Sequence, residues 1–185
     1  QSYAMESDDE VFAAHARHWT ALRDLFTGDT AAAVGGFSRA VEDHAARGDR
    51  EMEMTARYML ASALATDGAA DRALAEAREA ATLCEQHGER SARGYAEWAA
   101  ALAHWLLGHY DEAERTARRA LALRRGFGDG IAVALTTDLL GWIAGDHRQF
   151  GRARVLSRTA MGLWQAIGTS IGAFGPRLSG FAVAH

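Results

Sequence analysis

The sequence predicts an all-α, right-handed superhelical solenoid of four 40-residue helix pairs and a partial C-terminal helix. The first observation is a period of 40 residues without insertion or deletion, seen in Gly48, Gly88, Gly128 and Gly168. The second is an alanine-rich composition with a single proline, Pro176, which favours uninterrupted helices. A fixed period of this length is typical of stacked units that bury their apolar faces only against their neighbours.

The period divides the chain into four units between two short terminal segments. Residues 1–4 are expected to be an expression scar, and residues 5–185 a single repeat domain. The units span about 10–49, 50–89, 90–129 and 130–169, and residues 170–185 form a partial cap. Helix breaks are expected near residues 28, 48, 68, 88, 108, 128 and 148. All of these positions except Arg148 are glycine. The recurring Gly48, Gly88, Gly128 and Gly168 are expected in the left-handed conformation that follows many helix C-termini.

Each unit is expected to contain two helices, as the third unit illustrates. Its first helix begins at Ser91 or Arg93 and reaches about Leu107. Asp111 is the expected N-cap of the second helix, because Glu114 follows three residues later in a capping-box pattern.

Small residues recur at three positions of every unit. One position of the first helix holds Ala21, Ala61, Ala101 and Gly141. Two positions of the second helix hold Ala33, Ala73, Ala113 and Ala153, and Ala40, Ala80, Ala120 and Ala160. Small side chains at these places let helices approach closely. In this register the chain resembles a tetratricopeptide repeat (TPR), and Leu140-Gly141 and the turn at residues 108–113 match that repeat as well.

The 40-residue variant and the C-terminal segment resemble the helical-repeat region of large LuxR-type bacterial transcriptional regulators. The resemblance covers about residues 10–185, and it is closest over residues 161–170 (MGLWQAIGTS) and 173–176 (AFGP). It implies a sensor or scaffold domain with an ATPase domain upstream and a helix-turn-helix domain downstream. The present sequence contains no lysine and therefore no phosphate-binding Gly-x-x-x-x-Gly-Lys-Ser/Thr loop.

Composition and charge argue against several classes of function. The net charge is −4, so we expect no direct binding of nucleic acid by this segment. The arginine run of one helix is expected to be a solvated convex face: Arg115, Arg118, Arg119, Arg124 and Arg125. No segment has the apolar length of a membrane span or the pattern of a signal peptide, so a cytoplasmic protein is expected.

The sequence offers no set of side chains for catalysis or metal binding. Cys84 is the only cysteine and is expected to be a buried, inert thiol. No Cys/His spacing supplies the three or four ligands of a zinc site, and no nucleophile–base pair stands out. We therefore expect a protein that is not an enzyme and that holds no metal or cofactor.

Candidate binding residues lie at the outward positions of the first helices, which line the concave groove of the repeat that the chain resembles. They are His15, His18, Tyr58, Tyr95, Trp98, Trp105, Asp138 and Trp142. Four residues of the third unit, Tyr95, Trp98, Leu102 and Trp105, form one helical stripe. Such a stripe belongs either to the core or to a groove in which aromatic rings anchor a ligand.

The expected function is that of a regulatory module of a transcriptional regulator, binding a protein, a peptide or a small-molecule inducer. The alternative is a generic TPR adaptor unrelated to transcription. A clamp for chaperone tails is disfavoured, because such clamps use lysine and asparagine and the chain has neither. An uncapped solenoid end with the apolar residues Trp164, Ile167, Ile171 and Phe174 predicts self-association into a homodimer. The alternative is that the tail turns at Gly175-Pro176 and folds back as its own cap.

Overall fold

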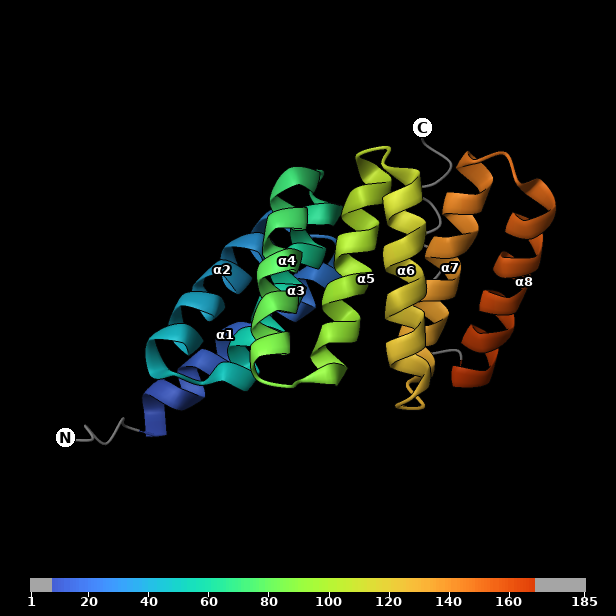
Figure 1. Cartoon of the computed structure of the whole chain (residues 1–185). Helices are drawn as coiled ribbons and strands as arrows, with labels where there is room; N and C mark the ends of the chain where they lie inside the picture. Colours follow the sequence, from blue (N-terminus) through green and yellow to red (C-terminus); the bar gives the residue numbers. More distant parts are fainter. Residues whose placement is uncertain (1–7, 169–185) are drawn as a thin grey trace.

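The structure is a stack of helix pairs. The computed structural model describes residues 8–168, and all regular structure in that range is α-helical. The helices are α1 (Asp8–Thr27), α2 (Thr30–Arg47), α3 (Arg50–Thr66), α4 (Ala70–Gln86), α5 (Arg90–Leu106), α6 (Tyr110–Arg125), α7 (Gly130–Asp146) and α8 (Phe150–Ile167). Successive pairs lie side by side along one direction (Figure 1). The predicted all-α solenoid of helix pairs is thus confirmed, while the expected scar and the partial C-terminal cap lie outside the described residues.

The 40-residue period of the sequence recurs in the helix boundaries. The odd-numbered helices from α3 on begin at residues 50, 90 and 130, and the even-numbered helices at 30, 70, 110 and 150. Each turn between helices contains a residue with positive φ at or beside an expected break. Gly168 also has a positive φ of 104°, but its ψ of 156° places it outside the left-handed helical conformation that we expected there.

Carboxylates cap the first helices of the second, third and fourth units. Asp49, Glu89 and Asp129 accept hydrogen bonds from backbone N–H groups at the starts of α3, α5 and α7. These bonds satisfy amides that have no partner within the helix. The expected cap at Asp111 was wrong: α6 begins at Tyr110, its N-cap His109 makes no side-chain bond, and Asp111 lies in the first turn.

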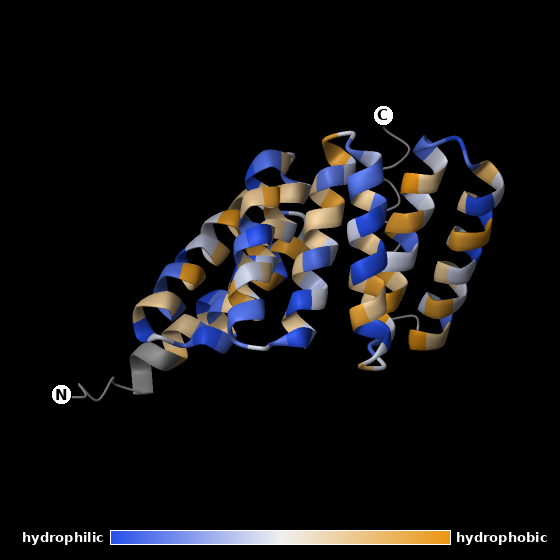
Figure 2. Cartoon of the chain, in the orientation of Figure 1, coloured by the Kyte–Doolittle hydropathy of each residue, from blue (hydrophilic) through white to orange (hydrophobic). Residues whose placement is uncertain are grey.

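Two layers of helices form the stack. The first helices, α1, α3, α5 and α7, contact one another in succession, and each packs against the second helices beside it. The core between the layers consists largely of alanine and leucine, and the helices carry both apolar and polar residues (Figure 2). The recurring Ala33, Ala73, Ala113, Ala40 and Ala120 are each 0% exposed, as close helix approach requires. We call the side of the odd-numbered helices that faces away from the second helices the first-helix face.

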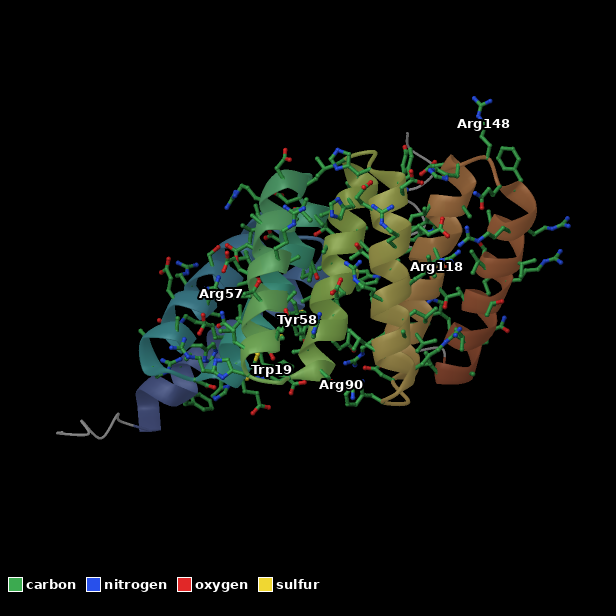
Figure 3. The ribbon with its side chains drawn as sticks, in the orientation of Figure 1. Trp19, Arg57, Tyr58, Arg90, Arg118 and Arg148 are labelled. Carbon is green, nitrogen blue, oxygen red and sulfur yellow. The ribbon has the colours of Figure 1, made fainter. Side chains whose placement is uncertain are left out.

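One turn uses an unfavourable residue. Arg148 has a φ of 57° between α7 and α8, where the other turns use glycine. Its side chain is exposed and points away from the helices (Figure 3). We expect Arg148→Gly to raise the free energy of unfolding by about 1 kcal/mol, since glycine has no Cβ to clash in this conformation. Thermal unfolding measures the gain, and Gly108→Ala, at a φ of 74°, should show a loss of similar size. An unchanged or lower midpoint for Arg148→Gly would contradict this account.

Candidate functional site

Two tyrosines from neighbouring units stack on each other. The rings of Tyr58 in α3 and Tyr95 in α5 lie 5.1 Å apart with an interplanar angle of 13°. The Tyr95 hydroxyl donates to Oδ2 of Asp129 at 2.9 Å, and the Arg124 guanidinium lies 4.1 Å from the Tyr95 ring centre. Burial raises the pKa of Tyr58 to about 12 and also raises the pKa of Tyr95. Both phenols are therefore neutral near pH 7.

A small hollow of about 130 Å³ opens beside this tyrosine pair, between α3 and α5. Its lining includes the carboxylates of Glu51 and Glu89 together with the two phenols. Glu89 already caps α5 through the N–H groups of Ser91 and Ala92, whereas Glu51 is exposed. Carboxylates in the lining of a small hollow suit a cationic side chain such as that of lysine or arginine.

Two tryptophans form a second aromatic pair, between α5 and α7. The rings of Trp105 and Trp142 lie 5.5 Å apart, and both side chains are half-buried. The indole N–H of Trp105 donates to Oδ2 of Asp146 at 2.6 Å. Asp146 therefore places a carboxylate beside the half-buried Trp105 ring. Sequence reasoning missed Asp146 and Glu51. The available signal was helical spacing, since Asp146 lies four residues after Trp142 and Glu51 seven residues before Tyr58.

The other predicted residues do not join these two pairs. His18 and Trp98 are 3% and 9% exposed, and Asp138 accepts a hydrogen bond from the Trp164 indole of α8 at 2.8 Å. His18 and Asp138 share one register position with Tyr58 and Trp98, 40 residues apart. At this position His18 lies 6.3 Å from His44 of its own unit and is buried, as Trp98 is, whereas Tyr58 reaches the hollow between α3 and α5.

Three histidines gather at the other end of the stack. The ring centres of His15 and His18 lie 5.8 Å and 6.3 Å from that of His44. Nδ1 of His18 and Nε2 of His44 are buried without hydrogen-bond partners. Within residues 8–168, no group of three His, Cys, Asp or Glu side chains is arranged to hold a metal ion. The three imidazole rings pack against one another between α1 and α2.

This cluster makes stability depend on pH. Burial lowers the pKa of both His18 and His44; the neighbouring histidines lower the pKa of His18 further, whereas Asp49 offsets part of the shift at His44. Since their unfolded-state pKa is about 6.5, the unfolded chain binds more protons below that value, and stability falls as the pH drops. We expect the thermal midpoint to decrease from pH 7.5 to pH 5.5, and His18→Gln with His44→Gln to flatten that decrease. Identical slopes in the wild type and the double variant would contradict this assignment.

Arg124 is the main residue that the sequence analysis misplaced. It was expected on a solvated face, but it is 3% exposed, between α5, α6 and the start of α7. Its Nη1 donates to the carbonyl and hydroxyl oxygens of Ser91 at 2.6 Å and 2.7 Å, and Nη2 forms an ion pair with Asp129. Because Asp129 also binds Tyr95, Arg124 holds the tyrosine pair in place. The other four arginines of the run are exposed, as expected.

Three further expectations concern Cys84, membrane-spanning helices and the surface for dimerisation. Cys84 is a buried free thiol, and burial raises its pKa to about 11. No helix within residues 8–168 has the length and apolarity needed to cross a membrane. Of the surface expected to drive dimerisation, Trp164 is only 7% exposed, and Ile171 and Phe174 lie outside the described residues.

Solved structures provide the comparison for this architecture. The apo form of RapI superposes with a TM-score of 0.68 at 12% identity, covering 86% of this chain and 44% of RapI. BtubC from P. vanneervenii gives 0.67 at 18% identity, covering 89% of this chain and 68% of BtubC. A kinesin light chain-like protein of P. anserina with nearly identical TPR-like repeats gives a TM-score of 0.64 at 16% identity, covering 85% of this chain and 78% of that protein.

The chain thus spans under half the length of RapI and about two thirds of BtubC. No protein-family model and no curated protein sequence matches it. At identities of 12–18%, the similarity to these structures is a similarity of backbone fold alone. The shared arrangement of helix pairs shows that the chain has an all-α, TPR-like solenoid fold.

Proposed function

We propose that the chain is a non-catalytic interaction module that binds a peptide segment of a protein partner along its first-helix face. The observation that carries this proposal is the pairing of aromatic side chains across unit boundaries, Tyr58 with Tyr95 and Trp105 with Trp142. Solenoids of this kind use such extended surfaces for recognition. Aromatic rings that are already ordered bind a partner at a low entropic cost.

The carboxylates beside the aromatic pairs set the chemistry of the proposed segment. Glu51 and Glu89 flank the tyrosine pair, and Asp146 lies beside Trp105. A segment with basic side chains between apolar residues complements both pairs, because its cations meet the carboxylates and its apolar side chains meet the aromatic rings. The net charge of −4 favours the approach of such a segment.

The parent protein is proposed to be a transcriptional regulator, in which occupancy of this module biases attached ATPase and DNA-binding domains. The support is the resemblance of residues 161–170 and 173–176 to LuxR-type regulators. A generic TPR adaptor is the second candidate, and it rests on the fold together with the aromatic pairs. The complete reading frame separates the two: an ATPase domain upstream and a helix-turn-helix downstream support the regulator, and their absence supports the adaptor.

Selection of a random peptide phage library on the purified protein tests the binding surface. We expect enriched sequences with basic and apolar residues, whose affinity falls at least about tenfold in Trp105→Ala with Trp142→Ala. Glu51→Gln changes only an exposed carboxylate and should selectively weaken peptides with a basic residue. Arg118→Ala, an exposed change on α6, is the matched control and should leave binding intact. Enriched peptides that bind the tryptophan double variant as well as the wild type would overturn the proposed surface.

A further inference from the structure

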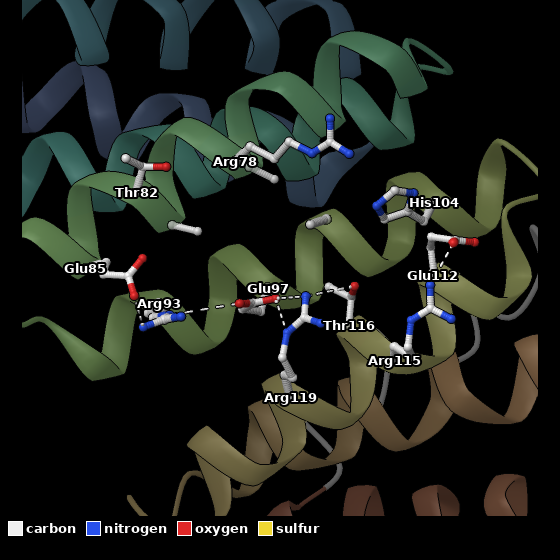
Figure 4. A pocket seen from close by; sticks show the side chains of 13 residues that line it. Arg78, Thr82, Glu85, Arg93, Glu97, His104, Glu112, Arg115, Thr116 and Arg119 are labelled. Atoms are coloured by element: carbon white, nitrogen blue, oxygen red, sulfur yellow. Dashed lines mark hydrogen bonds and ion pairs between the residues drawn. The ribbon is translucent and has the colours of Figure 1, made fainter.

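A second pocket lies among the second helices, away from the aromatic pairs. It has a volume of about 500 Å³, with walls from α4 and α6 and a floor from α5 (Figure 4). This volume lies within the range of small-molecule sites. We call it the outer pocket, and the proposed peptide-binding function makes no use of it.

The period of the sequence explains why the outer pocket opens in the third unit. Ala100 lies on its floor, at the register position held by Leu60 in the second unit and by Leu140 in the fourth. Those leucines are 5% and 4% exposed, so at their places the side chain fills the space beside the helix. At position 100 the smaller alanine leaves the space open. The small residue at this register position therefore contributes to the cavity.

The charges of the outer pocket are unequal in number. Its lining holds four arginines and three glutamates: Arg78, Arg93, Arg115, Arg119, Glu85, Glu97 and Glu112. Each glutamate already has an arginine partner. Arg119 reaches Glu97 at 3.0 Å, Arg93 reaches Glu85 at 3.3 Å, and Arg115 reaches Glu112 at 2.7 Å.

Arg78 provides the remaining positive charge. Its side chain extends from α4 along the pocket (Figure 4). No ion pair joins Arg78 to an acidic side chain among residues 8–168, whereas the other three arginines of the pocket are paired. One bound monoanion would therefore neutralise the unpaired positive charge of the pocket.

His104 gives a second, independent indication of a ligand. The side chain lines the pocket and is only 9% exposed, yet its Nδ1 has no hydrogen-bond partner. Burial and the charge of Arg78 both lower the pKa of His104, so the two side chains lie within electrostatic reach of each other. A buried ring nitrogen without a partner costs free energy that a bound acceptor would recover. Leu64 and Ala144 hold this register position in the adjacent units, so the imidazole is particular to the third unit.

We propose that the outer pocket binds a small organic monocarboxylate. The carboxylate pairs with Arg78 and accepts a hydrogen bond from His104. The carbon skeleton lies over the alanines of the pocket lining, Ala77, Ala81 and Ala100. A guanidinium with a neighbouring donor is a strong arrangement for a carboxylate, and the single excess positive charge matches a monoanion.

Calorimetric titration with acetate, benzoate, octanoate and inorganic phosphate tests this proposal. We expect saturable binding of at least one of the larger carboxylates, with a shift of the His104 ring resonances in NMR spectra. Ala100→Leu places in the pocket the residue that the adjacent units use, and it should weaken binding at least about tenfold while the fold is kept. Arg78→Gln should also weaken carboxylate binding at least about tenfold, because it removes the positive charge that pairs with the ligand.

Two matched controls lie on α6 outside the pocket lining. Ala122→Leu and Arg125→Gln, both at exposed positions, should leave carboxylate binding unchanged. The absence of saturable binding by all three acids, or equal affinity in Arg78→Gln and the wild type, would overturn the site. Tighter binding of phosphate than of any carboxylate would overturn the assignment to a monocarboxylate. Should Ala100→Leu unfold, the Arg78→Gln titration still decides the outcome.

Discussion

Replacing Arg124 with alanine is expected to lower the free energy of unfolding by about 3 kcal/mol. The change removes a buried guanidinium and leaves the Ser91 oxygens and the Asp129 carboxylate without their partner. It also leaves a cavity beside Tyr95, against which the guanidinium packs. In a domain of this size, the loss corresponds to a thermal midpoint lower by about 6–12 °C.

The neighbouring residue Arg125 provides the control for this experiment. Arg125 is exposed, so Arg125→Ala should change the free energy of unfolding by less than about 0.5 kcal/mol. Both variants are compared with the wild type by circular dichroism during heating and during urea titration. Equal midpoints for Arg124→Ala and Arg125→Ala would show that the buried network contributes nothing to stability.

Gly94→Ala is expected to destabilise the protein by about 2 kcal/mol, although alanine is the better helix former. A Cβ at Gly94 would lie 2.2 Å from Cδ and 2.8 Å from Cγ of Arg124. The guanidinium is fixed at its far end by Ser91 and Asp129, so the stem has little freedom to move aside. Overpacking of this kind costs more than the gain of up to about 1 kcal/mol in helix propensity.

Gly162→Ala supplies a control of opposite sign. Gly162 is exposed in α8, and an added Cβ there meets nothing within 4 Å, so this variant should be slightly more stable than the wild type. The double variant Gly94→Ala with Arg124→Ala should be less destabilised than the sum of its single variants, since removal of the arginine stem removes the clash. Additive losses would contradict the proposed contact between Gly94 and Arg124.

The sequence was sufficient to predict the helix breaks. Gly48, Gly88 and Gly128 are needed where the chain takes a positive φ, and a local requirement of that kind is visible at a fixed spacing. The identity of the small residues likewise predicted which helices pack closely. The N-cap of α6 was misplaced because the acidic residues after His109 suggested a capping box, whereas the helix begins before all of them, at Tyr110.

The candidate site could be predicted only in part, because α5 contacts helices on several sides. It packs against α3, α4, α6 and α7, so only a narrow strip of its surface remains free. The stripe from Tyr95 to Trp105 is divided accordingly: Trp98 is buried, while Tyr95 and Trp105 remain half-exposed. The burial of Arg124 depends on the absence of a side chain at Gly94, 30 residues earlier. Periodicity describes one helix at a time and does not reveal such a match of sizes between two helices.

Equivalent positions of the first and second helices carry different side chains from one unit to the next. The register positions of His18 and His44 are held by Tyr58 and Cys84, by Trp98 and Arg124, and by Asp138 and Trp164. The backbones of the units are nearly interchangeable, so a folding chain could in principle dock a helix one whole unit out of place. A misplaced helix would separate Arg124 from Ser91 and Asp129, or the Trp164 indole from Asp138, and these buried bonds would be lost. These unlike interiors therefore direct each helix to its own partner, which protects a protein of repeated backbone from kinetic traps and from exchange of units between chains.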